Sequence, residues 1–176
     1  MDAQGLQTLA VDCGGSGIKA SVLDSAGTMH VPKVRVPTPY PLPPERLLGL
    51  IGEIAAEFPA FGRMTLGMPG MIRHGVVVHT PHYINRSGPH TRVVPEVAAA
   101  WAGFDLQTAL ADRFQVPALV LNDAEVHGAG VVSGAGVELV LTLGTGLGSA
   151  LLDGGRIAPH LERSHAPVRW GATYDD

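Results

Sequence analysis

Two short glycine-rich segments have the residue types and spacing best suited to phosphate chemistry. The first is Asp12-Cys-Gly-Gly-Ser-Gly-Ile-Lys19, and the second is Leu143-Gly-Thr-Gly-Leu-Gly148. Glycine lets the backbone approach an anion closely, so that successive N–H groups can point into one concavity. The Ser16 and Thr145 hydroxyls and the Lys19 ammonium group would add further donors. Both segments are candidate phosphate-binding turns, although plain hairpin turns also use glycine, for its positive φ.

Neither segment fits the two commonest nucleotide-binding patterns. A P-loop requires G-x-x-x-x-G-K-[ST], and a dinucleotide fingerprint requires G-x-G-x-x-G at the start of a helix. The second segment instead continues into Ser149 to Asp153, a stretch typical of a strand. The sequence therefore predicts two β-hairpins with glycine tips, which would suit a cleft that grips a polyphosphate from both sides.

Acidic residues beside buried strands supply candidates for metal binding and proton transfer. Asp12 ends a buried strand before the first turn, where it could hold Mg²⁺ against phosphate oxygens or accept backbone N–H groups. Asp123 follows the apolar segment 119–121 and could be a general base for a substrate hydroxyl. Asn122 could bond a neighbouring hydroxyl. Asn and Asp are also the preferred residues at helix N-caps, and the residues alone favour capping.

The elements that must position these residues alternate between strands and helices, which predicts an α/β fold. We expect residues 80–99, which show no clear period, to form a long loop. Apolar patterns predict strands at 8–12, 17–24, 29–36, 64–68, 76–79, 116–121, 137–143 and 149–153, and helices at 45–58, 106–114 and 124–132.

Composition narrows the class of protein further. The 176 residues include 23 glycines and 14 prolines, yet 45% are hydrophobic and 16% charged, which argues against disorder. A net charge of −4 argues against nucleic-acid or anionic-membrane partners. The single cysteine, Cys13, permits no internal disulfide and no cysteine-based zinc site. No apolar run approaches the roughly 18 residues of a membrane span, and no signal peptide is evident, so we expect a cytoplasmic protein.

The ordered motifs resemble the ROK family, which contains glucokinases, other sugar kinases and sugar-responsive repressors. The similarity implies an actin-like (ribonuclease H-like) ATPase fold, with a complete N-terminal lobe over residues 1–135 and an incomplete C-terminal lobe over 136–176. The motifs are the two glycine turns, Gly67-Met-Pro-Gly70, Asn122-Asp123-Ala124 and Glu162-Arg-Ser-His165, the last with Ser164 in place of the family's glycine.

This resemblance implies an ATP-dependent, glucokinase-like hexose kinase that phosphorylates the sugar 6-hydroxyl. Asp123 would be the catalytic base, and Asp12 would organise Mg²⁺ and the phosphates of ATP or polyphosphate. Phosphate and nucleotide binding would fall to Asp12, Gly14, Gly15, Ser16, Gly17, Lys19, Gly144, Thr145 and Gly146. Sugar binding would fall to Gly70, Asn122, Glu162 and His165.

Departures from the family pattern define the alternatives. Few residues precede the first strand at Thr8, which argues against a repressor's DNA-binding helices, and the family's cysteine zinc cluster has no counterpart. The short second lobe keeps open a catalytically silent sugar-binding protein or kinase fragment, and a polyphosphate-dependent glucokinase. A homodimer could shield exposed strand edges.

Overall fold

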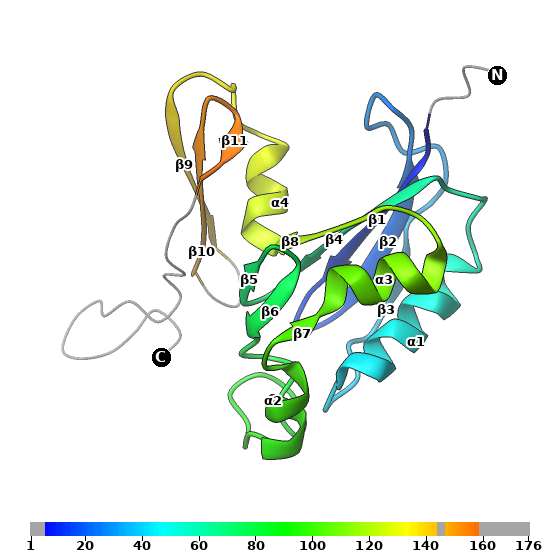
Figure 1. Ribbon diagram of the computed structural model, residues 1–176, viewed down its shortest axis with the longest axis vertical. Helices are drawn as coiled ribbons and strands as arrows, with labels where there is room; N and C mark the ends of the chain where they lie inside the picture. Colours follow the sequence, from blue (N-terminus) through cyan, green and yellow to red (C-terminus); the bar gives the residue numbers. More distant parts are fainter. Residues whose placement is uncertain (1–5, 144–146, 159–176) are drawn as a thin grey trace. The chain divides into compact units, whose positions relative to one another are not determined.

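The computed structural model describes residues 6–143 and 147–158, which form an α/β fold as the sequence predicts (Figure 1). The chain divides into two compact units, Met1–Leu121 and Asn122–Asp176. The lobe boundary after residue 135 stays a prediction. In the described part of the chain, no helix is both long and apolar enough to cross a membrane.

The main sheet of the first unit has the strand order β3-β2-β1-β4-β8. Strands β1 (Thr8–Cys13) and β2 (Ile18–Leu23) form an antiparallel hairpin around the first glycine turn. Strand β3 (Val34–Val36) pairs antiparallel with β2, and β4 (Arg63–Met68) pairs parallel with β1. Strand β8 (Ala118–Asn122) lies at the opposite edge from β3.

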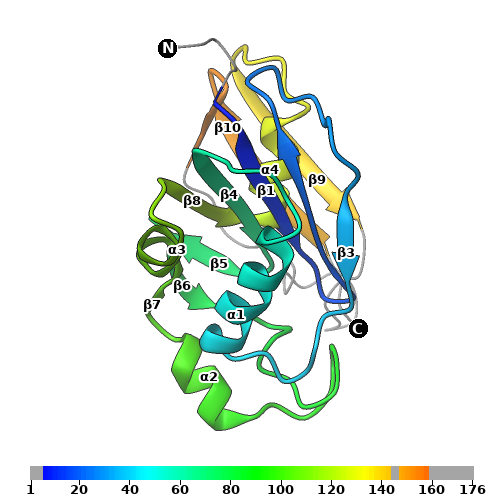
Figure 2. The same ribbon diagram turned by 90° about the vertical axis from the view of Figure 1, so that its right-hand side faces the viewer.

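Helices α1 (Pro44–Ala55) and α3 (Leu106–Phe114) cover one face of this sheet (Figures 1 and 2). Side chains alternate across a strand, so Leu9, Val11 and Cys13 enter this core, each 4% exposed or less. Asp12 points to the other face, where the register places it beside Lys19 on β2. The two polar candidates of the first turn are therefore kept out of the apolar core.

A smaller sheet of the first unit has the order β5-β6-β7, made of Met71–Arg73, Val76–His79 and Phe104–Asp105. The prediction that residues 80–99 form one loop is wrong at its end, because helix α2 covers Pro95–Trp101. Proline suits the first helical position, and Trp101 anchors the helix by donating from Nε1 to the Leu42 carbonyl at 2.8 Å. The run of alanines within α2 hides its periodicity.

Several predicted bounds also change. Strand β3 begins at Val34 and not near Met29, which makes only an isolated bridge with Leu23. Helix α4 (Asp123–Ala129) ends before the predicted Val132, with Gly130 as its C-cap. Gly128 and Gly130 lower the helix propensity there.

The second unit contains α4 and a sheet of order β11-β10-β9. Its strands are β9 (Val137–Leu143), β10 (Leu147–Asp153) and β11 (Arg156–Ile157). Helix α4 packs on one face, where a Cβ at Gly128 would lie 3.1 Å from the Ala150 Cβ. The opposite face exposes alternate residues of β9: Val137 71%, Leu139 63%, Leu141 56% and Leu143 73%.

Candidate active-site residues

The first glycine turn is a tight link between β1 and β2. The Gly14 N–H donates to the Gly17 carbonyl at 3.0 Å, which closes the turn. Ser16, at the tip, is exposed. The structure thus confirms a glycine-tipped hairpin at this position, as the sequence predicts.

Two side chains that the sequence analysis missed hold the carbonyls of this turn. The Thr38 hydroxyl donates to the Gly14 carbonyl at 2.6 Å, and the Tyr40 hydroxyl donates to the Gly15 carbonyl at 2.5 Å. In a trans peptide the N–H points opposite to the C=O. The N–H groups of Gly15 and Ser16 are therefore directed away from Thr38 and Tyr40, as an anion-binding turn requires.

The Tyr40 hydroxyl is suited to a permanent donor role. Burial raises the pKa of its phenol, so the group keeps its proton throughout the physiological range. The signal for Thr38 and Tyr40 in the sequence is faint: two hydroxyl-bearing residues alternate with prolines between Pro37 and Pro41. Only the fold brings them to the turn.

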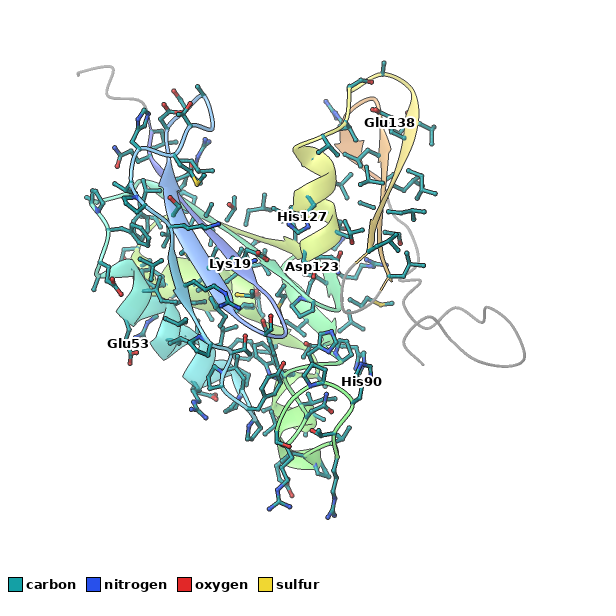
Figure 3. The ribbon with its side chains drawn as sticks, turned by 180° about the vertical axis from the view of Figure 1, so that it is seen from behind. Lys19, Glu53, His90, Asp123, His127 and Glu138 are labelled. Carbon is teal, nitrogen blue, oxygen red and sulfur yellow. The ribbon has the colours of Figure 1, made fainter. Side chains whose placement is uncertain are left out.

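Asp12 and Lys19 form a cross-strand ion pair next to the turn. Lys19 Nζ lies 3.1 Å from Asp12 Oδ2, and the two side chains are 43% and 38% exposed. Figure 3 shows Lys19 on β2, with Glu53 on α1 projecting away from the sheet. A half-exposed ion pair of this kind contributes only about 0–1 kcal/mol to stability, so it is not needed to hold the hairpin.

Asp12 has the chemistry of a Mg²⁺ ligand. Magnesium in kinases keeps several waters and uses one or two carboxylates together with substrate phosphates. One carboxylate beside a candidate phosphate-binding turn fits that requirement. Within residues 6–143 and 147–158, no group of three or more His, Cys, Asp or Glu residues is arranged to hold a metal by itself.

Gly70 has a backbone requirement of its own. It lies between β4 and β5 with φ of +117°, and a Cβ there would clash with the His79 carbonyl. Glycine is therefore demanded by the turn itself. The sugar-binding role implied for Gly70 stays a prediction.

Asn122 and Asp123 occupy the junction between β8 and α4, and the predicted capping is confirmed. The Asn122 Oδ1 accepts from the Ala124 N–H at 2.8 Å, and Glu125 Oε2 accepts from the Asn122 N–H at 3.0 Å. The second bond belongs to a capping box, which a bond from the Glu125 N–H to the Asn122 side chain completes. Glu125, which is buried, was missed, although the Asn-x-x-Glu spacing is the signature of that box.

Asp123 is the first residue of α4 and is half-buried. Its Oδ1 lies 2.9 Å from the Ala124 nitrogen. Figure 3 shows Asp123 and His127 on successive turns of the same helix. Because the capping box fixes the first turn of α4, the Asp123 carboxylate is held in a defined place.

The second glycine segment contributes to the seating of that helix. A Cβ at Gly148 would lie 3.0 Å from the Ala124 Cβ and would clash with the Thr142 hydroxyl. Glycine therefore lets the start of α4 approach β10. Gly144, Thr145 and Gly146, together with Glu162 and His165, lie outside the described residues.

Comparison with known proteins assigns the chain that carries these features to a family. The sequence pattern of the ROK family matches residues 8–159. The chain is 30% identical over 167 residues to the polyphosphate glucokinase of Mycobacterium tuberculosis (strain CDC 1551 / Oshkosh), covering 90% of this chain and 57% of that relative.

Solved structures show the same similarity. The inorganic polyphosphate/ATP-glucomannokinase of Arthrobacter sp. strain KM matches with a TM-score of 0.75 and 30% identity, over 97% of this chain and 67% of that one. A ROK family glucokinase from Streptomyces griseus, in complex with glucose and AMPPNP, matches with a TM-score of 0.67 and 23% identity, over 96% of this chain and 49% of that one.

The fold is thus part of the actin-like ATPase fold of ROK sugar kinases. The chain belongs to the ROK family. It spans 57% of the length of the Mycobacterium tuberculosis relative.

Proposed function

We propose that this chain carries the phosphate-binding turn and the catalytic base of a hexose kinase that phosphorylates the 6-hydroxyl of glucose or a similar sugar. The observation that supports this most directly is the first glycine turn. Thr38 and Tyr40 hold its carbonyls, which directs the N–H groups of Gly15 and Ser16 toward a bound anion. Asp12 and Lys19 lie beside the turn. Phosphoryl transfer asks little more of a protein than positioning, charge neutralisation and a base.

Asp123 is the proposed base. Its carboxylate would accept the proton of the sugar hydroxyl while the sugar oxygen bonds to the terminal phosphorus of the donor. The bond from that phosphorus to the bridging oxygen then breaks, and the shortened donor leaves with the bond's electron pair. The capping box around Asn122 and Glu125 supports this role, because it fixes the turn of helix that bears the carboxylate.

The proposed donor is a chain of phosphoryl groups, either ATP or inorganic polyphosphate. The Mycobacterium tuberculosis relative is named a polyphosphate glucokinase, and the Arthrobacter relative an inorganic polyphosphate/ATP-glucomannokinase. Asp12 would hold Mg²⁺, which supplies charge neutralisation for the phosphates when bound. The backbone at 144–146 is proposed to assist in donor binding.

Sugar binding is proposed for four residues of the family pattern: Gly70, Asn122, Glu162 and His165. For Asn122 the side-chain oxygen already accepts a capping bond, and its amide nitrogen has the chemistry to donate to a sugar hydroxyl. Cytoplasmic location and a homodimer complete the proposal.

Coupled glucose phosphorylation, with MgATP and with inorganic polyphosphate, tests the proposal. We expect Asp123→Ala to lower kcat by about 10²–10⁴-fold, the usual contribution of a general base. The matched control is Asp153→Ala, which removes an exposed carboxylate at the end of β10 and should leave kcat unchanged. Calorimetry that shows glucose binding, without turnover for the wild-type chain, would instead identify a catalytically silent sugar-binding protein.

A further inference from the structure

Arg35 on β3 brings a cation to the first glycine turn from outside the hairpin. A Cβ at Gly17 would lie 2.9 Å from both Nε and Nη2 of Arg35. The glycine therefore leaves the space in which the guanidinium lies against the turn's backbone. The turn thus has a cationic side chain packed on it, in addition to its backbone N–H groups.

In the row of charged side chains beside the turn, Arg35 is the one that has no counter-charge among the described residues. Asp12, Lys19 and Arg35 are register partners on three neighbouring strands, so they form one row. Lys19 is paired with Asp12 at 3.1 Å. Arg35 is exposed, and within residues 6–143 and 147–158 no carboxylate lies at ion-pair distance from it. The row therefore keeps one positive charge for a ligand.

The surroundings of the turn carry no negative charge from neighbouring segments. Residues 25–44 and 58–95 contain no Asp or Glu, although the whole chain has a net charge of −4. The residues that contact the turn from outside the hairpin and lie in these two ranges are Arg35, Thr38, Tyr40, His82 and Pro89. The segments that bring these five residues to the turn therefore bring no carboxylate with them, which favours an anionic ligand there.

We propose that Arg35 is a donor-binding residue whose guanidinium holds non-bridging phosphate oxygens beside the first glycine turn. This inference rests on the proposed function, because it assigns the ligand of the same turn. A guanidinium presents N–H donors in a planar fork that matches phosphate oxygens, and it stays charged at all physiological pH values. The triphosphate of ATP and inorganic polyphosphate offer this same chemistry.

Calorimetric titration of the 176-residue chain with MgATP, and separately with inorganic polyphosphate, tests the proposal in the absence of sugar. We expect Arg35→Gln to raise the Kd of at least one donor by about tenfold or more, the usual effect of losing a charge-assisted hydrogen bond. The donor whose binding falls identifies the source of the phosphate chain. Arg35→Lys, which keeps the charge but loses the fork, should give an intermediate Kd.

Arg63→Gln is the matched control. Arg63 lies on the same face of the same sheet, but it partners Thr8, four residues along the strands from the pair of Asp12 and Gly67. At about 3.3 Å per residue it is roughly 13 Å away. We expect the Kd of the Arg63→Gln variant for either donor to stay within about twofold of wild type, because a distant exposed charge is screened. Circular dichroism and melting temperature establish that each variant is folded.

Three results would overturn the inference: no binding of either donor by the wild-type chain, unchanged binding by Arg35→Gln, or equal losses in Arg35→Gln and Arg63→Gln. Glucose phosphorylation assayed in parallel separates this inference from the proposed function. If glucose is phosphorylated but the Kd of the donor does not depend on Arg35, only the inference is contradicted. Arg35-dependent binding without turnover supports the inference and contradicts the kinase assignment.

Discussion

The two glycine hairpins of this chain resemble each other in sequence but differ in what surrounds them. The hairpin of β1 and β2 lies inside a larger sheet, with one face on the core beneath α1 and α3. The hairpin of β9 and β10 has α4 on one face and four large apolar residues exposed on the other. The first hairpin is thus part of a five-stranded sheet, whereas the second has a face of exposed apolar side chains.

The glycines of the two hairpins also do different work. Gly17 leaves space for the Arg35 guanidinium, the far end of a flexible side chain, whereas Gly148 leaves space for Ala124 and Thr142 in its own unit. An added methyl group at Gly17 would displace a flexible side chain, whereas one at Gly148 would press on residues packed within its own unit. Gly17 is thus packed against a flexible charged side chain, whereas Gly148 is packed against Ala124 and Thr142.

The largest expected effect distinguishes the buried strand of the first hairpin from the exposed strand of the second. Leu9→Ala removes a fully buried side chain from β1, and we expect a loss of about 2–5 kcal/mol in the free energy of unfolding. Denaturant titration measures it. A loss below about 1 kcal/mol would show that the first hairpin is not the well-packed partner in the comparison.

Gly148→Ala should have the next largest effect. The added methyl group must push against Ala124 at the start of α4 and against Thr142, so we expect a loss of about 1–3 kcal/mol, as for other overpacked sites. Gly17→Ala is its counterpart, because Arg35 can move aside, and its melting temperature should stay close to wild type. If the two variants were equally destabilised, the distinction drawn between the two glycines would be wrong.

A smaller effect is expected when the carbonyl anchors of the first turn are removed. Tyr40→Phe deletes the hydroxyl that donates to Gly15, and we expect a loss of about 0.5–1.5 kcal/mol in stability. The KM for the phosphoryl donor should rise with little change in the KM for sugar, because the N–H groups of the turn lose their fixed direction. Thermal unfolding and initial rates measure both. A rise in the KM for sugar alone would contradict the positioning role.

The smallest effect on stability is expected at the exposed face of β9. Leu141→Thr replaces a side chain that is 56% exposed by a polar, β-branched one, and the unfolding free energy should change by no more than about 0.5 kcal/mol. Sedimentation measures self-association for the same variant. A loss of several kcal/mol would show that this face is covered in the folded protein.

The sequence was sufficient for elements whose signal is local. The helix at 106–114 and the strand at 137–143 have the bounds that their periodicity predicts, and the α/β class and the first hairpin are confirmed. Helix α2 was missed because an alanine run has no apolar period. Its anchoring depends on a bond from Trp101 to Leu42, 59 residues away.

The candidate site was predictable in its motifs but not in its supports. Asp12, Lys19 and the glycines are contiguous in sequence, so their spacing alone suggested a phosphate turn. Thr38 and Tyr40 act on Gly14 and Gly15 from 24 and 25 residues away, and Arg35 reaches Gly17 only because β3 pairs with β2. No local spacing encodes such contacts. Asn122 shows the converse, since its capping role was predicted from residue type.

The burial of Cys13 has a practical consequence. It is the chain's one cysteine, it is 0% exposed, and it directly precedes the first glycine turn. A thiol reagent can therefore label the protein only when this hairpin opens. The labelling rate measures how often that local opening occurs. A phosphoryl donor that binds the turn would lower the labelling rate. Saturation of the protein by the donor could then be followed with no substitution and no coupled enzyme.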